Sequence, residues 1–430
     1  MKKWKAVGTL AVVFFCGLAG LTGCIAKDTG KEEETENKKR VTLTFMTFKR
    51  ETRHIFEQII EEFNDSQDMV HIEQIVVPNP GEELKIRAVQ GRFPDMVEFI
   101  GDERDVFEQY VEGGYLSPVT DFSCVDKIYA QFLEKLKVGD EHYLLPLSIN
   151  YRGLFLNKGK MEEKGYPIPD TYEELIDVME QIKQDGETAI VFPDEDQWTI
   201  HQGWDAIDTV SRGIQEPLFR DAAEGIRSIS QDDLAVETTE KFLEIRKYGQ
   251  PNALSTGYDE AVKFFAAGNA YMFPQGNWAY PLIKRMNPKI DLVFIPFPVN
   301  EGKKQEIVVK LDSSIGVSAD CKDKEAVETF MEYLFSDEVN NYYSSEAGSY
   351  SCAVAPNRPE SYDEAFVKRI EEGSFSIEKY AFFSEIDDER NELFRRLVSQ
   401  PEQYPIKEFL GDLSDMLVIH RRGILMEDSE

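Results

Sequence analysis

The sequence is poor in cysteine, histidine and basic residues, and each shortage narrows the functions it can have. Its 430 residues include only five cysteines and five histidines, and 48 Lys and Arg stand against 80 Asp and Glu, a net charge of −32. A surface this acidic repels phosphate backbones, which argues against nucleic-acid binding. The five histidines are too scattered to suggest a ligand cluster, so we expect neither a bound metal nor any other cofactor.

Common catalytic motifs are also missing from the chain. There is no Gly-x-Ser-x-Gly elbow, no phosphate-binding loop and no His-Glu-x-x-His pattern. Acidic residues are so numerous that a glycosidase carboxylate pair cannot be recognised, because such a pair is defined by its spatial separation. We therefore expect a binding protein and no enzyme, and a surface-anchored glycan-active enzyme remains the alternative.

After the first 23 residues no apolar run is long enough to span a membrane. Residues 1–23 themselves combine a basic start with an apolar run of signal-peptide length. The run ends in "LTGC", which resembles the lipobox of bacterial lipoproteins, in which the cysteine carries the lipid. This resemblance implies cleavage before Cys24, lipidation (including palmitate) of that residue, and anchoring on the extracytoplasmic face of the cell membrane. Polar residues 24–40 then form a flexible tether.

The remaining cysteines give little information. Cys16 leaves with the signal peptide, and Cys124, Cys321 and Cys352 are irregularly spaced. An exported protein can form a disulfide bond among three such residues, but the sequence does not say whether any two pair.

Residues 41–430 show a mixed α/β pattern. Strands are predicted at 41–48, 70–77 and 94–100, with a helix at about 55–63 between the first two, which indicates parallel strands joined by crossovers. The pattern continues with strands at 142–147, 153–157, 291–298 and 306–319, and with helices at about 170–183, 324–334, 387–397 and 407–417. Because the pattern occupies both halves of the chain, we expect two lobes, with a ligand at the carboxyl ends of their strands.

Several phrases in order resemble the extracellular solute-binding lipoproteins of ABC sugar importers, the family that includes maltose-binding protein. They are "GGYLSPVTDF" at 113–122, "EHYLLPLSINYRGLFLNKGKMEEKGYPIPDTYEELID" at 141–177, "FAAGNAYMFPQGNWAY" at 265–280, "IPFPVNEG" at 295–302 and "DKEAVETFMEYLFSDEVNNYYSSEAGSYSCAVAP" at 323–356. The sequence departs from the family pattern at "KLDSSIGVSA", at Tyr172 and at Asn269, which leaves the identity of the ligand open.

The resemblance implies a two-lobed periplasmic-binding-protein-like fold of class II type, with hinged lobes around a central ligand cleft. Lobe one would comprise 41–150 and 298–343, and lobe two 151–297 and 344–430, with crossings near 150–152, 296–298 and 342–348. The implied function is capture of a carbohydrate outside the membrane and its delivery to ABC transporter permease subunits, by a monomer. A binding protein for a peptide, a polyamine or another non-sugar solute is the alternative within the same class.

A sugar site needs aromatic rings for the flat faces of the pyranose and polar side chains for its hydroxyl groups. The resemblance places Trp278 at a sugar-stacking position, although a tryptophan there could also be core. From their places near strand ends and crossings, the other predicted ligand-binding residues are Tyr151, Arg152, Phe48, Arg50, Glu98, Asp312, Ser313 and Trp204.

Overall fold

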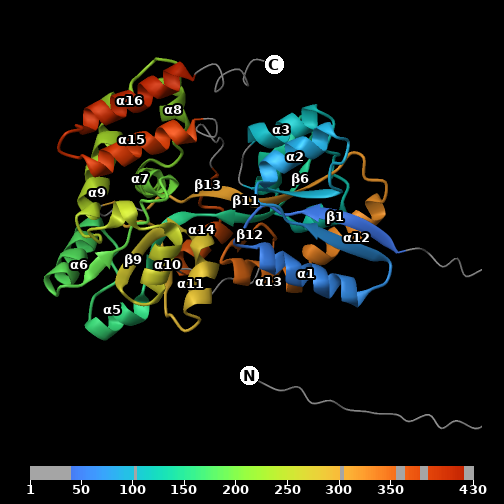
Figure 1. The fold of residues 1–430 in the computed structure, drawn as a ribbon, viewed down its shortest axis with the longest axis horizontal. Coiled ribbons are helices and arrows are strands. Elements are labelled where there is room, and N and C mark those ends of the chain that lie inside the picture. Colours follow the sequence, from blue (N-terminus) through green and yellow to red (C-terminus); the bar gives the residue numbers. More distant parts are fainter. Residues whose placement is uncertain (1–39, 101–103, 301–304, 355–363, 378–385, 421–430) are drawn as a thin grey trace, which may run out of the picture. The chain divides into compact units, whose positions relative to one another are not determined.

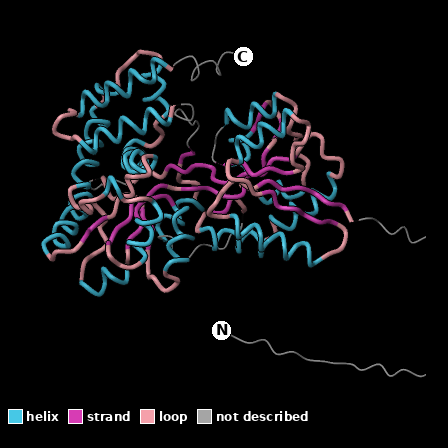
Figure 2. Tube along the Cα trace, viewed as in Figure 1, coloured by secondary structure: helices cyan, strands magenta, loops and turns pink. Residues whose placement is uncertain are grey.

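The first sheet is mixed, and its parallel part begins the folded chain. The computed structural model describes residues 40–100, 104–300, 305–354, 364–377 and 386–420. Within them the sheet has the strand order β12-β6-β11-β3-β1-β2, and β13 pairs with β11 (Figures 1 and 2). Its strands are β1 (Val41–Met46), β2 (Val70–Ile75), β3 (Met96–Ile100), β6 (Leu144–Asn150), β11 (Val308–Val317), β12 (Tyr350–Ser351) and β13 (Ser376–Ile377).

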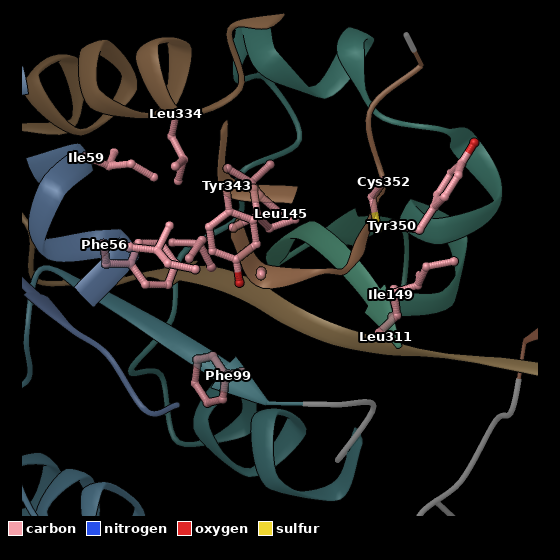
Figure 3. Close-up of a cluster of buried hydrophobic side chains, with 14 of the residues drawn as sticks. Phe56, Ile59, Phe99, Leu145, Ile149, Leu311, Leu334, Tyr343, Tyr350 and Cys352 are labelled. Atoms are coloured by element: carbon pink, nitrogen blue, oxygen red, sulfur yellow. The ribbon is translucent and has the colours of Figure 1, made fainter. Parts of the chain in front are cut away.

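Strands β1, β2 and β3 are parallel, as the strand–helix alternation predicted. Helix α1 (Arg53–Ser66) connects the first two and buries Ile55, Ile59 and Phe63, which recur at four-residue steps and so lie on one face. Strand β11 then runs antiparallel to both β3 and β6. In the close-up of this core, Tyr343 lies between Phe56 and Leu145 (Figure 3).

The second sheet has the order β10-β7-β9-β8, with strands β7 (Arg152–Leu156), β8 (Thr188–Ile190), β9 (Ala270–Gly276) and β10 (Val293–Ile295). Its two faces contribute to different cores. Leu154 and Leu156 belong to one core and the intervening Phe155 to the other, because successive side chains on a strand point to opposite faces. A separate hairpin pairs β4 (Lys137–Val138) with β5 (Glu141–His142).

Helices cover both sheets. The core that includes the first sheet also takes buried side chains from α2 (Pro80–Val89), α3 (Arg104–Glu112), α4 (Ala130–Leu133), α10 (Tyr258–Ala266), α11 (Tyr280–Met286), α12 (Lys324–Leu334), α13 (Asp337–Ala347) and α14 (Glu364–Glu371). The other core takes them from α5 (Lys158–Lys164), α6 (Tyr172–Gln184), α7 (Trp198–Arg212), α8 (Glu216–Ala223), α9 (Asp233–Arg246), α15 (Asp387–Ser399) and α16 (Ile406–Ile419).

The chain passes from one sheet to the other at Tyr151. Strand β6 of the first sheet ends at Asn150, and β7 of the second begins at Arg152. The return to the first sheet lies between β10, which ends at Ile295, and β11, which begins at Val308. The sequence predicted crossings near 150–152, 296–298 and 342–348, and these two passages lie at Tyr151 and between Ile295 and Val308.

The C-terminal part differs from the expected grouping of 344–430 with lobe two. Strand β12 pairs with β6 and β13 with β11, both strands of the first sheet, and Val367 and Ile370 of α14 lie in the first core. Helices α15 and α16, with the flanking residues Ile386 and Tyr404, lie in the second core, and the two helices pack against α7 and α8 (Figure 1). Strands of two residues carry no readable alternation, so their pairing depends on tertiary contacts.

Side chains cap the start of helix α6, which the sequence predicted at about 170–183. The side chain of Thr171 accepts a hydrogen bond from the backbone N–H of Glu174 at 3.3 Å, and the Glu174 carboxylate accepts from the N–H of Asp170 at 2.8 Å. This arrangement supplies partners for donors that a helix start leaves unsatisfied. Among the described residues, no helix combines the length and apolarity needed to cross a membrane.

Candidate functional site

A buried ion pair lies at the carboxyl end of β1. The Nζ atom of Lys49 donates to both carboxylate oxygens of Asp312, at 2.6 and 2.7 Å. Asp312 also accepts from Ser148 at 3.3 Å and from Asn150 at 3.4 Å. Burial lowers the pKa of Lys49, but the attraction of Asp312 outweighs it, so this pKa lies above its ordinary value. The negative charge of Asp312 is therefore balanced by the positive charge of Lys49 within the sheet.

Asp312 points to Lys49 because β11 is irregular at this residue. Leu311 pairs with Ile149 and Ser313 with Ser148, so Asp312 is an extra residue between consecutive partners on β6. Such a bulge bends the strand and changes the direction of a side chain. The "LDSS" segment, where the sequence departs from the family pattern, thus corresponds to a bulge at the end of the first sheet.

Glu98 on β3 is also engaged by its own chain. One carboxylate oxygen accepts from the backbone N–H groups of Phe48 and Lys49, at 2.8 and 3.4 Å, and the other accepts from Ser313 at 2.7 Å. Burial raises the pKa of Glu98, and these contacts oppose the shift. In this structure Glu98 and Ser313 bind each other, so neither presents the free hydrogen-bonding edge that the sequence suggested.

The start of β7 carries a second buried charge cluster. Arg152 donates to Gln202, and its terminal nitrogen lies 4.0 Å from Asp205, which is also 2.5 Å from Arg390 of α15. Burial alone raises the pKa of Asp205, but the cations around it, Arg390 first, lower it well below its ordinary value. Arg152 is thus positioned by α7, whereas its connection to α15 through Asp205 has no signal in the sequence.

Three aromatic rings gather beyond the end of β9. Trp198 lies 5.4 Å from Tyr258 and 6.4 Å from Trp278, measured between ring centroids. Both indoles are partly exposed, whereas Tyr258 is buried. Gly276 makes room for Trp278, since a Cβ at this glycine would lie 1.9 Å from the indole ring. The Gly-Asn-Trp order therefore lets the indole lie directly against the backbone of its own turn.

The loop after β1 reaches this aromatic cluster. Arg50 forms an exposed ion pair with Asp259, at 3.1 Å, and Asp259 follows Tyr258 at the start of α10. The charges of Glu51, Asp259 and Arg50 all act on the hydroxyl group of Tyr258. Phe48 is partly buried and stacks on Phe99 at 6.4 Å. The structure thus brings the predicted residue Arg50 close to the helix that carries Tyr258.

Two other predicted residues lie deeper. Tyr151 is 4% exposed and packs edge-on against Phe294 at 6.0 Å. Trp204 is completely buried, donates from Nε1 to Thr239 at 3.0 Å, and packs on Phe394 at 5.8 Å. In this structure Trp204 belongs to the second core and presents no face to a ligand, which differs from the prediction. Its burial depends on α9 and α15, which are remote in the sequence.

Sequence reasoning missed Lys49, Tyr258 and Gln202. Lys49 lies between two predicted residues, and a lysine directly after a strand is ordinarily read as a solvated turn. Tyr258 begins a helix and carries no motif of its own, and Gln202 lies one turn from Trp198 on α7. Only the fold shows that these residues contact the predicted ones.

Metal and thiol chemistry find no support in the described part of the chain. Its residues include no group of three or more His, Cys, Asp or Glu side chains that could hold a metal ion. Cys124, Cys321 and Cys352 are buried free thiols, which answers the question of their pairing. Burial raises the pKa of the Cys124 thiol to about 12, far from a reactive value. Cys24 and residues 25–39 of the predicted tether lie outside the described residues, whereas Arg40 is described and donates to the carbonyl oxygen of Val70 at 3.0 Å.

Two surface hollows of about 680 Å³ each lie beside α1. One is lined by His54, Glu57, Gln58, Glu61, Glu62, Asp65 and Ser66, and the other by Arg53, Glu57, Ile60, Glu61, Asn64, Asp65, His71, Gln74 and Val76. Neither hollow is lined by a predicted site residue or by a Phe, Tyr or Trp ring. Their acidic linings suit water and ions better than the apolar face of a sugar, so we place the candidate site at the sheet ends.

The family model for bacterial extracellular solute-binding proteins matches residues 58–372. The chain belongs to this family. It is 26% identical to the multiple sugar-binding protein of Streptococcus mutans over 360 residues, which cover 81% of this chain and 83% of that one. The family membership and this relative agree with the resemblance inferred from the sequence.

Solved structures show the same fold. RafE from Streptococcus pneumoniae, in its apo form, matches with a TM-score of 0.73 and 21% identity over 89% of this chain and 98% of its own. A structure of RafE in complex with raffinose matches equally well. A sugar transporter from Bacillus licheniformis in complex with stachyose matches with a TM-score of 0.64 and 19% identity over 87% of this chain and all of its own. The fold is the two-lobed α/β fold of solute-binding proteins.

Proposed function

We propose that this protein captures a neutral carbohydrate outside the membrane and delivers it to an ABC transporter permease. The observation that carries the proposal is the cluster of Trp198, Tyr258 and Trp278 at the end of β9, with two partly exposed indoles. Indole faces stack on the C–H faces of pyranose rings, and their polar edges suit sugar hydroxyl groups. The sugar-binding relative and the raffinose and stachyose complexes support this ligand class.

The state of the buried carboxylates favours a neutral ligand over a polyamine. Asp312 is compensated by Lys49, Glu98 accepts from Ser313 and two backbone N–H groups, and Asp205 is held by Arg390. A cationic ligand would have to displace these partners to reach any of the three carboxylates, at the cost of leaving other buried groups unpaired. These three carboxylates therefore offer a cation little net attraction.

We further propose that Cys24 carries a lipid, including palmitate, which anchors the protein on the extracytoplasmic face of the cell membrane. The basic start, the apolar run and "LTGC" support this anchor. We assign 41–150 and 298–343 to lobe one and 151–297 to lobe two. The strand pairings and core contacts support adding β12, α14 and β13 to lobe one and α15 and α16 to lobe two. The protein acts as a monomer, and the lobes close on the ligand.

A thermal-shift screen of the purified protein, with its signal peptide removed, tests the proposal. The probes are raffinose, stachyose, galactose and chitin oligosaccharides, with spermidine as the cationic competitor and a dipeptide mixture as the third class. A sugar present at about 100 times its Kd stabilises the native state by about 2.7 kcal/mol, enough for a clear rise in melting temperature. A shift with spermidine or peptides alone contradicts the proposal, and release of hydrolysed sugar in the same wells supports the enzyme alternative.

A further inference from the structure

Asn277 joins two separate parts of the chain, and it does so next to Trp278. Its side-chain oxygen accepts from the backbone N–H of Tyr151 at 2.8 Å, and its own backbone N–H donates to the carbonyl oxygen of Tyr151 at 3.1 Å. Its side-chain nitrogen donates to the carbonyl oxygen of Gly348 at 3.1 Å. The residue is 2% exposed, so water does not replace these bonds easily.

Both partners of Asn277 lie at changes of direction in the chain. Tyr151 is the single residue between β6 of the first sheet and β7 of the second. Gly348 has a φ of 59° and ends α13, just before β12 pairs with β6. Each of these points adjoins the first sheet, whereas Asn277 follows β9 of the second sheet.

A second contact reinforces the bond to Gly348. A Cβ at this glycine would lie 2.4 Å from Cδ1 of Tyr280, which begins α11 and follows Asn277 by three residues. The backbone of the α13–β12 corner therefore packs directly against the ring of Tyr280. Glycine is required here both by the left-handed backbone and by this close approach.

The same short turn sets the indole of Trp278. Asn277–Ala279 is a single 3-10 turn, and the indole of Trp278 packs against Gly276, the residue that precedes this turn. A backbone rotation within this turn would therefore move the Trp278 indole and the Asn277 amide together. A change at the aromatic cluster has a direct mechanical route to the strand crossing.

We propose that Asn277 is a positioning residue that locks the Tyr151 crossing and the α13–β12 corner to the Trp278 turn, and so sets the relative orientation of the two sheets. The inference rests on the proposed function only for the purpose of the lock. A receptor that closes on its ligand needs the ring that contacts the ligand, Trp278, to be connected to the crossing between its lobes, at Tyr151. The lock itself is a property of the protein without ligand.

The test measures distances between the two sheets in the ligand-free protein. Spin labels are attached at V89C on α2 and I226C after α8, both at exposed positions, in the protein without its signal peptide and with C24S, so that the remaining native thiols are the buried Cys124, Cys321 and Cys352. Pulsed electron resonance then compares wild type, Asn277→Ala and the control Asn157→Ala. Asn157 is a similarly buried asparagine that caps α5, so its loss costs stability without touching a crossing.

We expect Asn277→Ala to broaden the distance distribution and Asn157→Ala to leave its width unchanged. Asn277→Asp keeps an acceptor for Tyr151 but sets a carboxylate oxygen against the carbonyl oxygen of Gly348, so it should also broaden the distribution. It replaces the alanine variant if that variant does not fold. The inference is overturned if Asn277→Asp has the same distance distribution as the wild type, and Asn277→Ala either has that distribution too or does not fold.

A ligand arm separates this inference from the proposed function. Raffinose is added to the same labelled proteins. In Asn277→Ala, which loses the two side-chain hydrogen bonds to Tyr151 and Gly348, we expect its affinity to fall about tenfold. Broadening without ligand, combined with no response to any sugar in wild type, supports the lock and contradicts carbohydrate binding. If the distance distributions of the Asn277 variants keep the wild-type width, and the wild-type protein still responds to sugar, the result contradicts the lock and supports carbohydrate binding.

Discussion

Lys49 and Asp312 are 263 residues apart in the chain, yet the ammonium group of one contacts both carboxylate oxygens of the other, at 2.6 and 2.7 Å. The pair is almost completely buried, with 7% and 5% of the two side chains exposed. It connects the end of β1 to the bulge in β11 and determines how much negative charge the sheet end presents. The character of the site therefore depends on this contact as well as on the aromatic rings.

Removal of either partner should destabilise the protein strongly. Lys49→Met leaves the Asp312 carboxylate buried with only Ser148 and Asn150 as donors, and we expect a loss of about 3–5 kcal/mol in the free energy of unfolding. Urea denaturation measures it. The double variant Lys49→Met/Asp312→Leu should lose less than either single variant. A loss within about 0–1 kcal/mol for the single variants, as for exposed ion pairs, would show that the pair is solvated.

His201 should make the protein less stable in mild acid. Burial, and next the positive charge of Arg390, lower its pKa to about 4, from 6.5 in the unfolded chain, although Asp205 at 3.2 Å opposes the shift. Between these values the unfolded state binds the proton and the native state does not. Stability is therefore full above pH 6.5 and falls as the pH decreases toward 4, by on the order of 3 kcal/mol.

Chemical denaturation at pH 7, 5.5 and 4.5 checks this window, with His201→Gln as the comparison. The variant should have a flatter profile between pH 6.5 and 4, because its side chain does not titrate. The lowered pKa of Asp205 contributes only in more acidic solution, below its ordinary value of 3.8. A profile identical in the two proteins would assign the acid sensitivity to other groups.

Gly276→Ala should displace the indole of Trp278. The new Cβ would stand 1.9 Å from the ring, whereas the backbone of Gly276, at a φ of −79°, accepts alanine without strain. We expect a shift in tryptophan fluorescence and weaker sugar binding with little loss of fold. Gly81→Ala on α2 is the matched control, since a Cβ there meets nothing within 4 Å. Equal tryptophan fluorescence spectra for the two variants would show that Gly276 does not determine the position of the Trp278 indole.

Sequence patterns predicted the elements better than their contacts. Helix α12 occupies residues 324–334 as expected, because its apolar spacing and its length are local properties. The pairing of β12 and β13 with the first sheet was not predicted, since two-residue strands carry no period. The bulge at Asp312 was also unpredictable, because a bulge is defined by the register against a partner strand.

In the candidate site, too, the sequence predicted which residues to consider but did not predict their contacts. The sequence predicted both Trp278 and Trp204 as ligand-binding residues, Trp278 from the family resemblance. In the structure α9 and α15 bury Trp204, whereas Trp278 is partly exposed. The sequence identified Glu98 and Asp312 at strand ends but gave no sign that Ser313 and Lys49 would engage them. Side chains more than a hundred residues apart meet only through the fold.

The most direct test of carbohydrate binding at the aromatic cluster is isothermal titration calorimetry with the sugar that gives the largest thermal shift. It compares wild type with Trp278→Ala and with Trp204→Phe, a core variant expected to lose about 2 kcal/mol of stability. Trp278→Ala should remain folded and show no heat of binding, whereas Trp204→Phe should bind with wild-type affinity. Wild-type binding by folded Trp278→Ala, or no heat with any sugar in the wild-type protein, would contradict the proposed function.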